Sequence, residues 1–428
     1  MTDAATLDRP DTTTPEHLIA ELSQAGRRAQ RALARASGAE KAEALREAAA
    51  SIRADASAIL NANTRDVAAG EASGLSGAML DRLRLDGDRL EAIAAAIENV
   101  ASLPDPVGEE IARSEAPAGM TLVRRRIPIG LIGIIYESRP NVTADAAALC
   151  LRSGNAALLR GGSEAVHSNR ALHASFVKGV EQAGLPAEAI QLLPTQDRAA
   201  VGAMLKAAGL IDMIVPRGGK GLVARVQEDA RVPVLAHLDG ICHTYIHAAA
   251  DPAMAREIAV NAKMRRTGIC GAMETLLIDA NFPAAGDVLA AIADEGCELR
   301  GNARAQAIDE RVKPASDEDW DTEYLDAVLS VAVVDGLDAA MEHIATHSSG
   351  HTDAIVTADQ DAADRFLAEV DSAIVMHNAS SQFADGGEFG LGAEIGIATG
   401  RLHARGPVAL EGLTTYKWQV LGTGQARS

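Results

Sequence analysis

Short apolar runs alternate with Ala-rich or amphipathic segments along most of the chain, and this alternation most constrains the fold. Runs such as LIGIIYE, AALLR and IDMIVP have the length of buried strands, and the segments between them are long enough for helices. Parallel strands need such crossover segments, whereas antiparallel strands need only short turns. The pattern therefore predicts an α/β chain built on a parallel, doubly wound sheet.

A second alternating region begins near residue 251. A predicted helix over 252–266 leads to the strand METLLID, and the runs AVLSVAVVD, DAIVTA and SAIVM predict further strands. In the first region, VPVLAH at 232–237 is also expected to form a strand. The segment TLVRRRIP, with charges in its middle, predicts an exposed edge strand, and GLTTYKWQVLG predicts a final strand.

Composition and charge narrow the class of protein. The chain has 428 residues, enough for two or three domains, and only 3% are aromatic, so Ala, Leu, Ile and Val must build the core. The formal net charge of −19 disfavours binding to nucleic acid or to an anionic membrane. No apolar run reaches about 20 residues, so no membrane-spanning segment is expected.

The start of the chain and the cysteines indicate a reducing compartment. The run MTDAATLDRPDTTTPEH has no apolar stretch behind a basic flank, so we expect no secretory signal. Cys150, Cys242, Cys270 and Cys297 show no C-x-x-C spacing, which favours free thiols and disfavours a zinc site. The expected location is the cytoplasm, and no metal is expected.

Cys270 has the most suggestive surroundings of the cysteines. It lies in the turn-like run TGICG, after Arg265 and Arg266 and before the apolar run METLLID. Cationic groups and unsatisfied backbone N–H groups lower the pKa of a thiol, so this position suits a nucleophile. A lone cysteine more often serves only packing, and these residues alone slightly favour that role.

Two glycine-rich turns each follow an apolar strand and precede a helix: RGGSEA at 160–165 and RGGKG at 217–221. Glycine lets a phosphate approach the backbone, and a helix N-terminus favours an anion. Neither turn matches G-x-G-x-x-G or a Walker motif, and each alone is compatible with an ordinary turn. Two such turns in one sheet favour a dinucleotide site at its carboxyl edge.

Three further segments carry polar side chains. In YESRPNVT, Asn141 follows a strand end and suits either a helix cap or a donor to an oxyanion. HLDGICHTY contains His237, Asp239 and His243, which we expect to form a structural cluster because no further ligand completes a metal set. Arg405, in the glycine-rich tail, suits either an anionic substrate or an exposed loop.

Together, these segments resemble the gamma-glutamyl phosphate reductase branch of the aldehyde dehydrogenase superfamily. The resemblance extends from about residue 120 to the C-terminus and rests on PIGLIGIIYESRPNVTADAAALCLRSGNAALLRGGSEAVHSN, IVPRGGKGL, HLDGICHTYI, SSGHTDAIVT and DGGEFGLGAEIGIATGRLHARGP. YESRPNVT and FGLGAEIGIATGRLHARGP are similar to this branch in particular. The resemblance implies reduction of L-glutamyl 5-phosphate, an acyl phosphate, by NADPH to glutamate 5-semialdehyde, the second step of proline biosynthesis from glutamate.

The resemblance also implies roles for individual residues. Cys270 matches the catalytic cysteine that forms a thioester, and Asn141 matches a side-chain donor to the oxyanion. Glu323 matches the acidic residue that holds the nicotinamide ribose. The other implied cofactor-binding residues lie in the two glycine-rich turns: Arg160, Gly161, Gly162, Ser163, Glu164, Arg217, Gly218, Gly219 and Lys220. Arg160, expected beside the adenosine ribose, favours NADP(H) over NAD(H).

The chain departs from the pattern of this branch at two positions. Gly271 follows the cysteine where the branch usually has Asn, and Gln382 replaces a basic residue. Because Gln382 cannot bind a substrate anion as a cation would, Arg139, Arg265 and Arg405 are the candidate contacts.

The region where the superfamily places a water-activating glutamate reads AHLDG, with His237 roughly in register. Lack of that carboxylate fits an enzyme whose acyl group exchanges with phosphate instead of water. Two alternatives remain: a hydrolytic or CoA-acylating aldehyde dehydrogenase, and a non-catalytic member that binds nucleotide through the same fold.

The resemblance implies a division into domains. A Rossmann-like NADP-binding domain is expected over 15–112 and 129–245, and an α/β catalytic domain over 246–384. Residues 385–404 are expected to form a substrate-side loop and connection.

A small β oligomerisation arm is expected from residues 113–128 and 405–428, with strands that pair between subunits. The resemblance therefore implies a homo-oligomer. A functional contact with glutamate 5-kinase is also expected.

Overall fold

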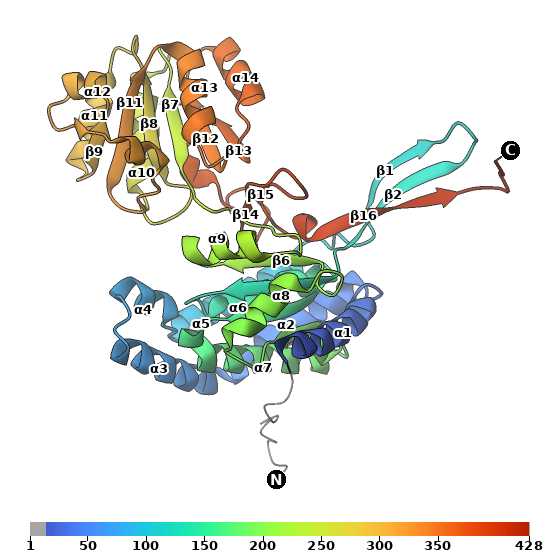
Figure 1. Ribbon diagram of the computed structural model, residues 1–428. Helices are drawn as coiled ribbons and strands as arrows, with labels where there is room; N and C mark the ends of the chain where they lie inside the picture. Colours follow the sequence, from blue (N-terminus) through green and yellow to red (C-terminus); the bar gives the residue numbers. More distant parts are fainter. Residues whose placement is uncertain (1–13, 428) are drawn as a thin grey trace. The chain divides into compact units, whose positions relative to one another are not determined.

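The computed structural model describes residues 14–427, which form two compact units (Figure 1). Unit 1 comprises the described residues up to Leu235 together with those from Leu413 onward, and unit 2 comprises Ala236–Gly412. Each unit has its own parallel sheet and its own hydrophobic core. The α/β class predicted from the sequence is confirmed.

The sheet of unit 1 has four parallel strands in the order β5-β4-β3-β6. Its strands are β3 (Leu131–Tyr136), β4 (Ala156–Gly161), β5 (Ile190–Leu192) and β6 (Met213–Arg217). All six residues of β3 are buried, as the apolar run predicts. The chain runs outward from β3 to β5 and then returns to β6, so the switch point of the topology lies between β3 and β6.

Helices flank this sheet and supply most of unit 1. They are α1 (Pro15–Leu33), α2 (Gly38–Ala54), α3 (Ala56–Ala72), α4 (Gly77–Leu83), α5 (Gly87–Ser102), α6 (Asn141–Arg152), α7 (Val166–Gln182), α8 (Arg198–Lys206) and α9 (Lys220–Asp229). One core cluster joins Leu131 and Ile135 of β3 to side chains of α1, α8 and α9. Helix α6 contacts β3 and β4 and packs against α2, α5 and α7.

The sheet of unit 2 is also parallel, with the order β10-β9-β11-β8-β7-β12-β13. Its strands are β7 (Cys242–Ile246), β8 (Met273–Asp279), β9 (Glu298–Gly301), β10 (Lys313–Pro314), β11 (Val328–Val334), β12 (Thr352–Val356) and β13 (Ile374–His377). Its helices are α10 (Pro252–Met264), α11 (Ala285–Asp294), α12 (Ala303–Ile308), α13 (Gly336–His347) and α14 (Gln360–Glu369).

Helices cover both faces of this second sheet. Leu276 and Ile278 of β8 belong to a core cluster with α10 and α11, whereas Leu277 belongs to a separate cluster with α13 and α14. Alternate residues of one strand therefore serve two cores, as expected of a doubly wound sheet. The short elements are β14 (Ile397–Ala398), β15 (Gly406–Pro407) and the 3₁₀ turns η1 (Ser163–Ala165), η2 (Ala187–Ala189), η3 (Asp317–Asp321), η4 (Ser381–Phe383) and η5 (Glu411–Leu413).

The arm is an antiparallel sheet of unit 1 in the order β1-β2-β16. Its strands are β1 (Glu110–Glu115), β2 (Thr121–Pro128) and β16 (Thr414–Leu421). The two segments expected to form the arm pair with each other within the chain, in register from Thr414 opposite Pro128 to Leu421 opposite Thr121. Pairing of the arm between subunits stays a prediction. In addition, β15 pairs with β14, and residues 405–412 belong to unit 2 and not to the arm.

Two local predictions differ from the structure. Residues 236–245 were expected in the first domain, but they belong to unit 2, where Cys242–Ile246 form β7 between β8 and β12. The strand expected over 232–237 is wrong, because only Val234 forms a bridge, to Ile214, and its neighbour Pro233 has no N–H for a ladder. NADP-binding and catalytic roles for the two units remain predictions.

No helix within residues 14–427 is long and apolar enough to cross a membrane. Residues 1–13, the segment for which no secretory signal was expected, lie outside the described part of the chain.

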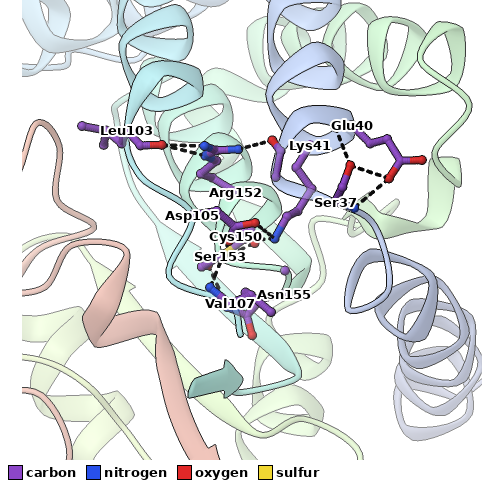
Figure 2. A network of polar contacts seen from close by, with 12 residues as sticks. Ser37, Glu40, Lys41, Leu103, Asp105, Val107, Cys150, Arg152, Ser153 and Asn155 are labelled. Atoms are coloured by element: carbon purple, nitrogen blue, oxygen red, sulfur yellow. Dashed lines mark hydrogen bonds and ion pairs between the residues drawn. The ribbon is translucent and has the colours of Figure 1, made fainter. Parts of the chain in front are cut away.

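A buried ion pair between Lys41 and Asp105 joins helix α2 to the linker after α5 (Figure 2). Lys41 is fully buried, and its ammonium group lies 2.7 Å from a carboxylate oxygen of Asp105. Asp105 also accepts from the Val107 backbone N–H, at 3.0 Å.

Arg152 of α6 donates to the carbonyls of Leu103 and Gly38, so α2, α6 and the linker share one polar network. Burial lowers the pKa of Lys41, and Asp105 opposes this shift.

We expect Asp105→Ala to lower the free energy of unfolding by about 3–5 kcal/mol, because it leaves the buried Lys41 without its counter-ion. The shift of the urea unfolding midpoint measures this effect. The matched control is Asp335→Ala, whose partner Arg304 is exposed and whose own side chain is 80% exposed. That change should cost less than about 1 kcal/mol. Equal losses in the two variants would contradict the proposed importance of the buried pair.

Candidate active site

Cys270 lies in a turn between the end of α10 and the start of β8, and its side chain is half-buried. The neighbouring strands in the sheet order are β7 and then β12. Because these strands are parallel, the segments that precede them meet at the same edge of the sheet as Cys270. This amino edge brings together Gly240, which precedes β7, Cys242, which begins β7, and His351, which precedes β12.

Glycine is required at position 240 by close packing of the backbone. A Cβ atom on Gly240 would lie 2.1 Å from the carbonyl oxygen of Cys270 and 2.7 Å from its Cα atom. The turn therefore rests directly on the loop before β7. Gly271 is also confined, since a Cβ there would lie 3.1 Å from the Ser381 carbonyl oxygen. The chain offers little room for the larger residue usual at position 271 in the branch.

Sequence reasoning assigned no role to two of the groups around Cys270. The thiol of Cys242 donates to the carbonyl of Cys270 at 3.1 Å, and its sulfur lies 3.6 Å from Nδ1 of His351. Burial raises the pKa of Cys242 well above its ordinary value, so this thiol stays protonated. His351 is fully buried beside His237, with ring centroids 5.1 Å apart. Only the pairing of β7 with β12 reveals this proximity, which no local motif signals.

The segment carrying Glu323 is held against the same region of unit 2. Its carboxylate accepts from the Gly240 N–H at 3.0 Å. The next turn is fixed by Glu274, which accepts from the Leu325 N–H at 3.2 Å and contacts the buried Lys263 ammonium group at 2.5 Å. Burial raises the pKa of Glu274 to about 7, and Lys263 acts in the opposite direction. Glu323 is thus tied to the loop beneath the cysteine.

Gln382 has a structural function where the branch carries a basic residue. Its amide donates to the carbonyls of Ala262 and Arg266 and so satisfies orphan groups at the end of α10. Its amide oxygen accepts from Arg265 at 3.4 Å. The departure noted in the sequence therefore stabilises the helix that leads into the Cys270 turn.

The three candidate arginines have different surroundings. Arg139, after β3, and Arg265, after α10, are exposed. Arg405 forms an ion pair with Asp371 at 2.6 Å and donates to the carbonyl oxygens of Thr399 and Asp371. An anion at Arg405 would have to share it with Asp371.

In unit 1, the predicted cofactor residues lie at the carboxyl ends of β3, β4 and β6. Glu164, after β4, accepts from the backbone and hydroxyl groups of Ser138, after β3, and this joins the two loops. Arg160 lies one residue before the end of β4 and donates to the Gln196 carbonyl at 3.3 Å, while its buried Nε has no partner in the described chain. Burial lowers the pKa of Arg160, and Glu164 opposes this shift.

The second glycine-rich turn opens helix α9 next to the switch point of the sheet. Glu137, after β3, donates its backbone N–H to the carbonyl of Arg217, the last residue of β6, so the two strand ends are held together. Gly219 precedes α9 without a side-chain cap, and a Cβ at Gly219 or Gly221 would meet no atom within 4 Å. An uncapped helix N-terminus with open space before it fits the phosphates of a dinucleotide.

Asn141 is the first residue of α6, and it does not cap that helix. Its amide donates to Asp145 at 2.8 Å, one turn further along. Desolvation raises the pKa of Asp145 to about 6, while Asn141 and Arg217 oppose the shift. An amide has two N–H hydrogens, so this bond orients the group and leaves one donor for a ligand. The i,i+4 spacing in NVTAD is the sequence signal that could have identified Asp145.

We expect Gly240→Ala to displace the Cys270 turn and to lower the free energy of unfolding by about 1–3 kcal/mol, because the new methyl group overlaps backbone atoms that cannot move independently. The rate of Cys270 alkylation by iodoacetamide, followed by mass spectrometry, should change as well. Gly202→Ala is the matched control, since a Cβ there would meet nothing within 4 Å. Unchanged stability and alkylation in Gly240→Ala would show that the contact is unimportant.

Comparison with known proteins identifies the family of the chain. Residues 5–306 match the aldehyde dehydrogenase family. Gamma-glutamyl phosphate reductase of Novosphingobium aromaticivorans is 72% identical over 410 residues, 96% of each chain, and that of Zymomonas mobilis is 62% identical over 97% of this chain and 98% of its own. The crystal structure of gamma-glutamyl phosphate reductase from Thermotoga maritima superposes with a TM-score of 0.94 at 40% identity, covering 96% of this chain and all of that one. The chain belongs to the gamma-glutamyl phosphate reductases of the aldehyde dehydrogenase family, an enzyme family that uses nicotinamide cofactors.

Proposed function

We infer that the chain reduces L-glutamyl 5-phosphate to L-glutamate 5-semialdehyde, releases phosphate, and so carries out the second step of proline biosynthesis from glutamate. The observation that carries this conclusion is 72% identity, over 96% of both chains, to a relative named gamma-glutamyl phosphate reductase. In balanced form, the acyl phosphate, NADPH and a proton give the semialdehyde, NADP⁺ and inorganic phosphate.

Cys270 is the proposed nucleophile. Its thiolate attacks the acyl carbon, phosphate departs with the electron pair of the C–O bond, and a thioester remains on the sulfur. The second N–H of Asn141 and the backbone N–H of Cys270 are the proposed donors to the oxyanion, a type of contact whose loss typically lowers the rate about 10²–10³-fold. Support comes from the position of Cys270 in a turn fixed by Gly240, and from the orientation of Asn141 by Asp145.

NADP(H) is the proposed cofactor. When bound, it supplies the hydride that converts the thioester to a thiohemiacetal, which then collapses to the aldehyde and the Cys270 thiolate. The N-terminus of α9 with Arg217, Gly218, Gly219 and Lys220 would hold the pyrophosphate, since its open, uncapped N–H groups suit an anion. Arg160 would face the 2′-phosphate of the adenosine ribose.

The neighbouring residues complete this assignment. Gly161, Gly162, Ser163 and Glu164 would line the adenosine side, and Glu323 would hold the nicotinamide ribose. The substrate carries a carboxylate and a phosphate, for which Arg139 and Arg265 are the proposed contacts, with Arg405 as a third that shares Asp371.

The remaining expectations are also proposals. Assembly into a homo-oligomer through the arm is proposed from the exposed side chains of Tyr416, Trp418 and Val420 on β16. A functional contact with glutamate 5-kinase and a cytoplasmic location are proposed from the metabolic role alone.

In the reverse direction, oxidation of the semialdehyde with NADP⁺ should require phosphate, because the thioester can leave Cys270 only by transfer to phosphate. Rates are measured with and without phosphate by NADPH absorbance. Cys270→Ala should lose roughly 10⁴-fold or more of the activity, while Cys297→Ala, at a buried thiol elsewhere in unit 2, should retain it. Oxidation that runs equally fast without phosphate would identify a hydrolytic enzyme instead, and full activity in Cys270→Ala would exclude the cysteine mechanism.

Arg160→Ala should reduce the preference for NADPH over NADH, expressed as the ratio of kcat/KM values, roughly 10- to 100-fold. The reason is loss of one charge-assisted hydrogen bond to the 2′-phosphate, worth about 1.5–3 kcal/mol. Arg231→Ala, at an exposed arginine of the same unit, is the control. If the Arg160 variant keeps the ratio of the parent enzyme, this arginine does not read the 2′-phosphate.

A further inference from the structure

Two histidines flank the Cys270 sulfur within unit 2. One ring nitrogen of His237, one of His351 and Sγ of Cys270 all lie within 4.8 Å of one another. The sequence predicted no metal site, because His237 and His243 lacked a further ligand nearby in the chain. The parallel strands β8, β7 and β12 supply the missing ligands from positions 270 and 351.

His237 is oriented as metal-binding histidines usually are. Its Nδ1 lies 2.8 Å from the carbonyl oxygen of Ile397. A carbonyl can only accept, so Nδ1 carries the ring proton and Nε2 carries the lone pair in the neutral imidazole. A backbone carbonyl that fixes the tautomer in this way is the common outer partner of a histidine ligand.

His351 keeps one ring nitrogen without a hydrogen-bond partner in the described chain. Nδ1 of His351 lies 2.9 Å from Oγ1 of Thr352 and 3.6 Å from the Cys242 sulfur, and both atoms are able to accept a hydrogen bond. Nε2 is buried with no hydrogen-bond partner in the described chain, and it carries the lone pair in the tautomer whose Nδ1 proton those two atoms accept. A buried, unpaired acceptor on a fixed ring is unusual and suits a ligand.

We propose that His237, Cys270 and His351 form a three-ligand site for Zn²⁺ or a similar soft divalent cation, and that occupation of this site reversibly blocks the Cys270 thiol. The ligand set contains one thiolate and two neutral imidazoles, the donors that Zn²⁺ prefers. Zn–N bonds of about 2.0–2.1 Å and a Zn–S bond of about 2.3 Å put tetrahedral ligand atoms roughly 3.3–3.7 Å apart. Three side-chain atoms already within 4.8 Å of one another need only a small adjustment to reach that geometry.

Binding exchanges a proton for the metal. The Cys270 thiol loses its proton to solvent, a sulfur–metal bond forms, and the sulfur lone pair that would attack an acyl carbon is occupied. Three protein ligands leave a fourth position for water. Buried Asp353, which acts electrostatically on His351, helps to balance the added positive charge. The blocking effect rests on the proposed role of Cys270 as nucleophile, whereas the binding itself does not.

Cobalt tests the site directly, because Co²⁺ takes the place of Zn²⁺ and reports its ligands in its absorption spectrum. The full chain titrated with Co²⁺ should gain a sulfur-to-cobalt charge-transfer band and the intense visible bands of a four-coordinate ion, and Zn²⁺ should displace them. In parallel, Zn²⁺ should slow alkylation of Cys270 and inhibit the phosphate-dependent activity, and a chelator should reverse both effects.

Ligand variants separate this site from adventitious binding. Cys270→Ser should abolish the charge-transfer band, and His237→Gln should weaken Co²⁺ binding at least about 100-fold, more than the 10- to 100-fold typical of losing an outer partner. His351→Asn should behave like His237→Gln, provided that it melts as the parent does. His17→Gln, at an exposed histidine, and Cys297→Ser, at a thiol outside the cluster, are controls that should bind as the parent chain does.

The outcomes distinguish the site from the proposed function. A charge-transfer band that persists in Cys270→Ser, or Co²⁺ affinity unchanged in His237→Gln, would overturn the metal site and leave the reductase assignment intact. A normal cobalt spectrum with no inhibition by Zn²⁺ would support the site and count against Cys270 as the nucleophile.

Discussion

Contact between two stretches of backbone fixes the position of Cys270, the proposed nucleophile. The loop before β7 presses against the turn before β8 so closely that position 240 cannot carry a side chain. The Glu323 carboxylate accepts from the Gly240 N–H of the first stretch. The Cys242 thiol donates to the Cys270 carbonyl of the second. Because β7 and β8 are adjacent in the sheet, strand pairing and this contact reinforce each other.

The two units use opposite edges of their parallel sheets. In unit 1 the predicted cofactor residues follow β3, β4 and β6 at the carboxyl edge, where open α/β sheets usually bind ligands. In unit 2 the cysteine and its histidine neighbours precede β8, β7 and β12 and so lie at the amino edge. A search guided only by the carboxyl-edge rule would have found the first set and missed the second.

Sequence reasoning recovered what is encoded locally. The apolar runs gave β3, β4, β6, β8 and β12, the turn residues located Cys270, and the resemblance named the family. What it missed depends on pairing between distant segments. CHTYI was interpreted as a polar cluster because its histidines obscured a buried strand, and VPVLAH was taken for a strand although Pro233 prevents regular pairing. The proximity of His351 to Cys270, 81 positions earlier, follows only from the order of strands in the second sheet.

The pairing of β16 with β2 has a consequence for how the chain reaches its native state. Unit 2 is inserted between two parts of unit 1, and Asn155 near β4 donates to the carbonyl of Leu413 just before β16. During synthesis, the edge of β2 that pairs with β16 therefore stays unpaired until all of unit 2 has left the ribosome. Domains fold largely as units as they emerge, so unit 2 can complete its core before unit 1 acquires its closing strand. The segment most exposed to mispairing in that interval is the arginine-rich TLVRRRIP, whose charges oppose association with a second nascent chain.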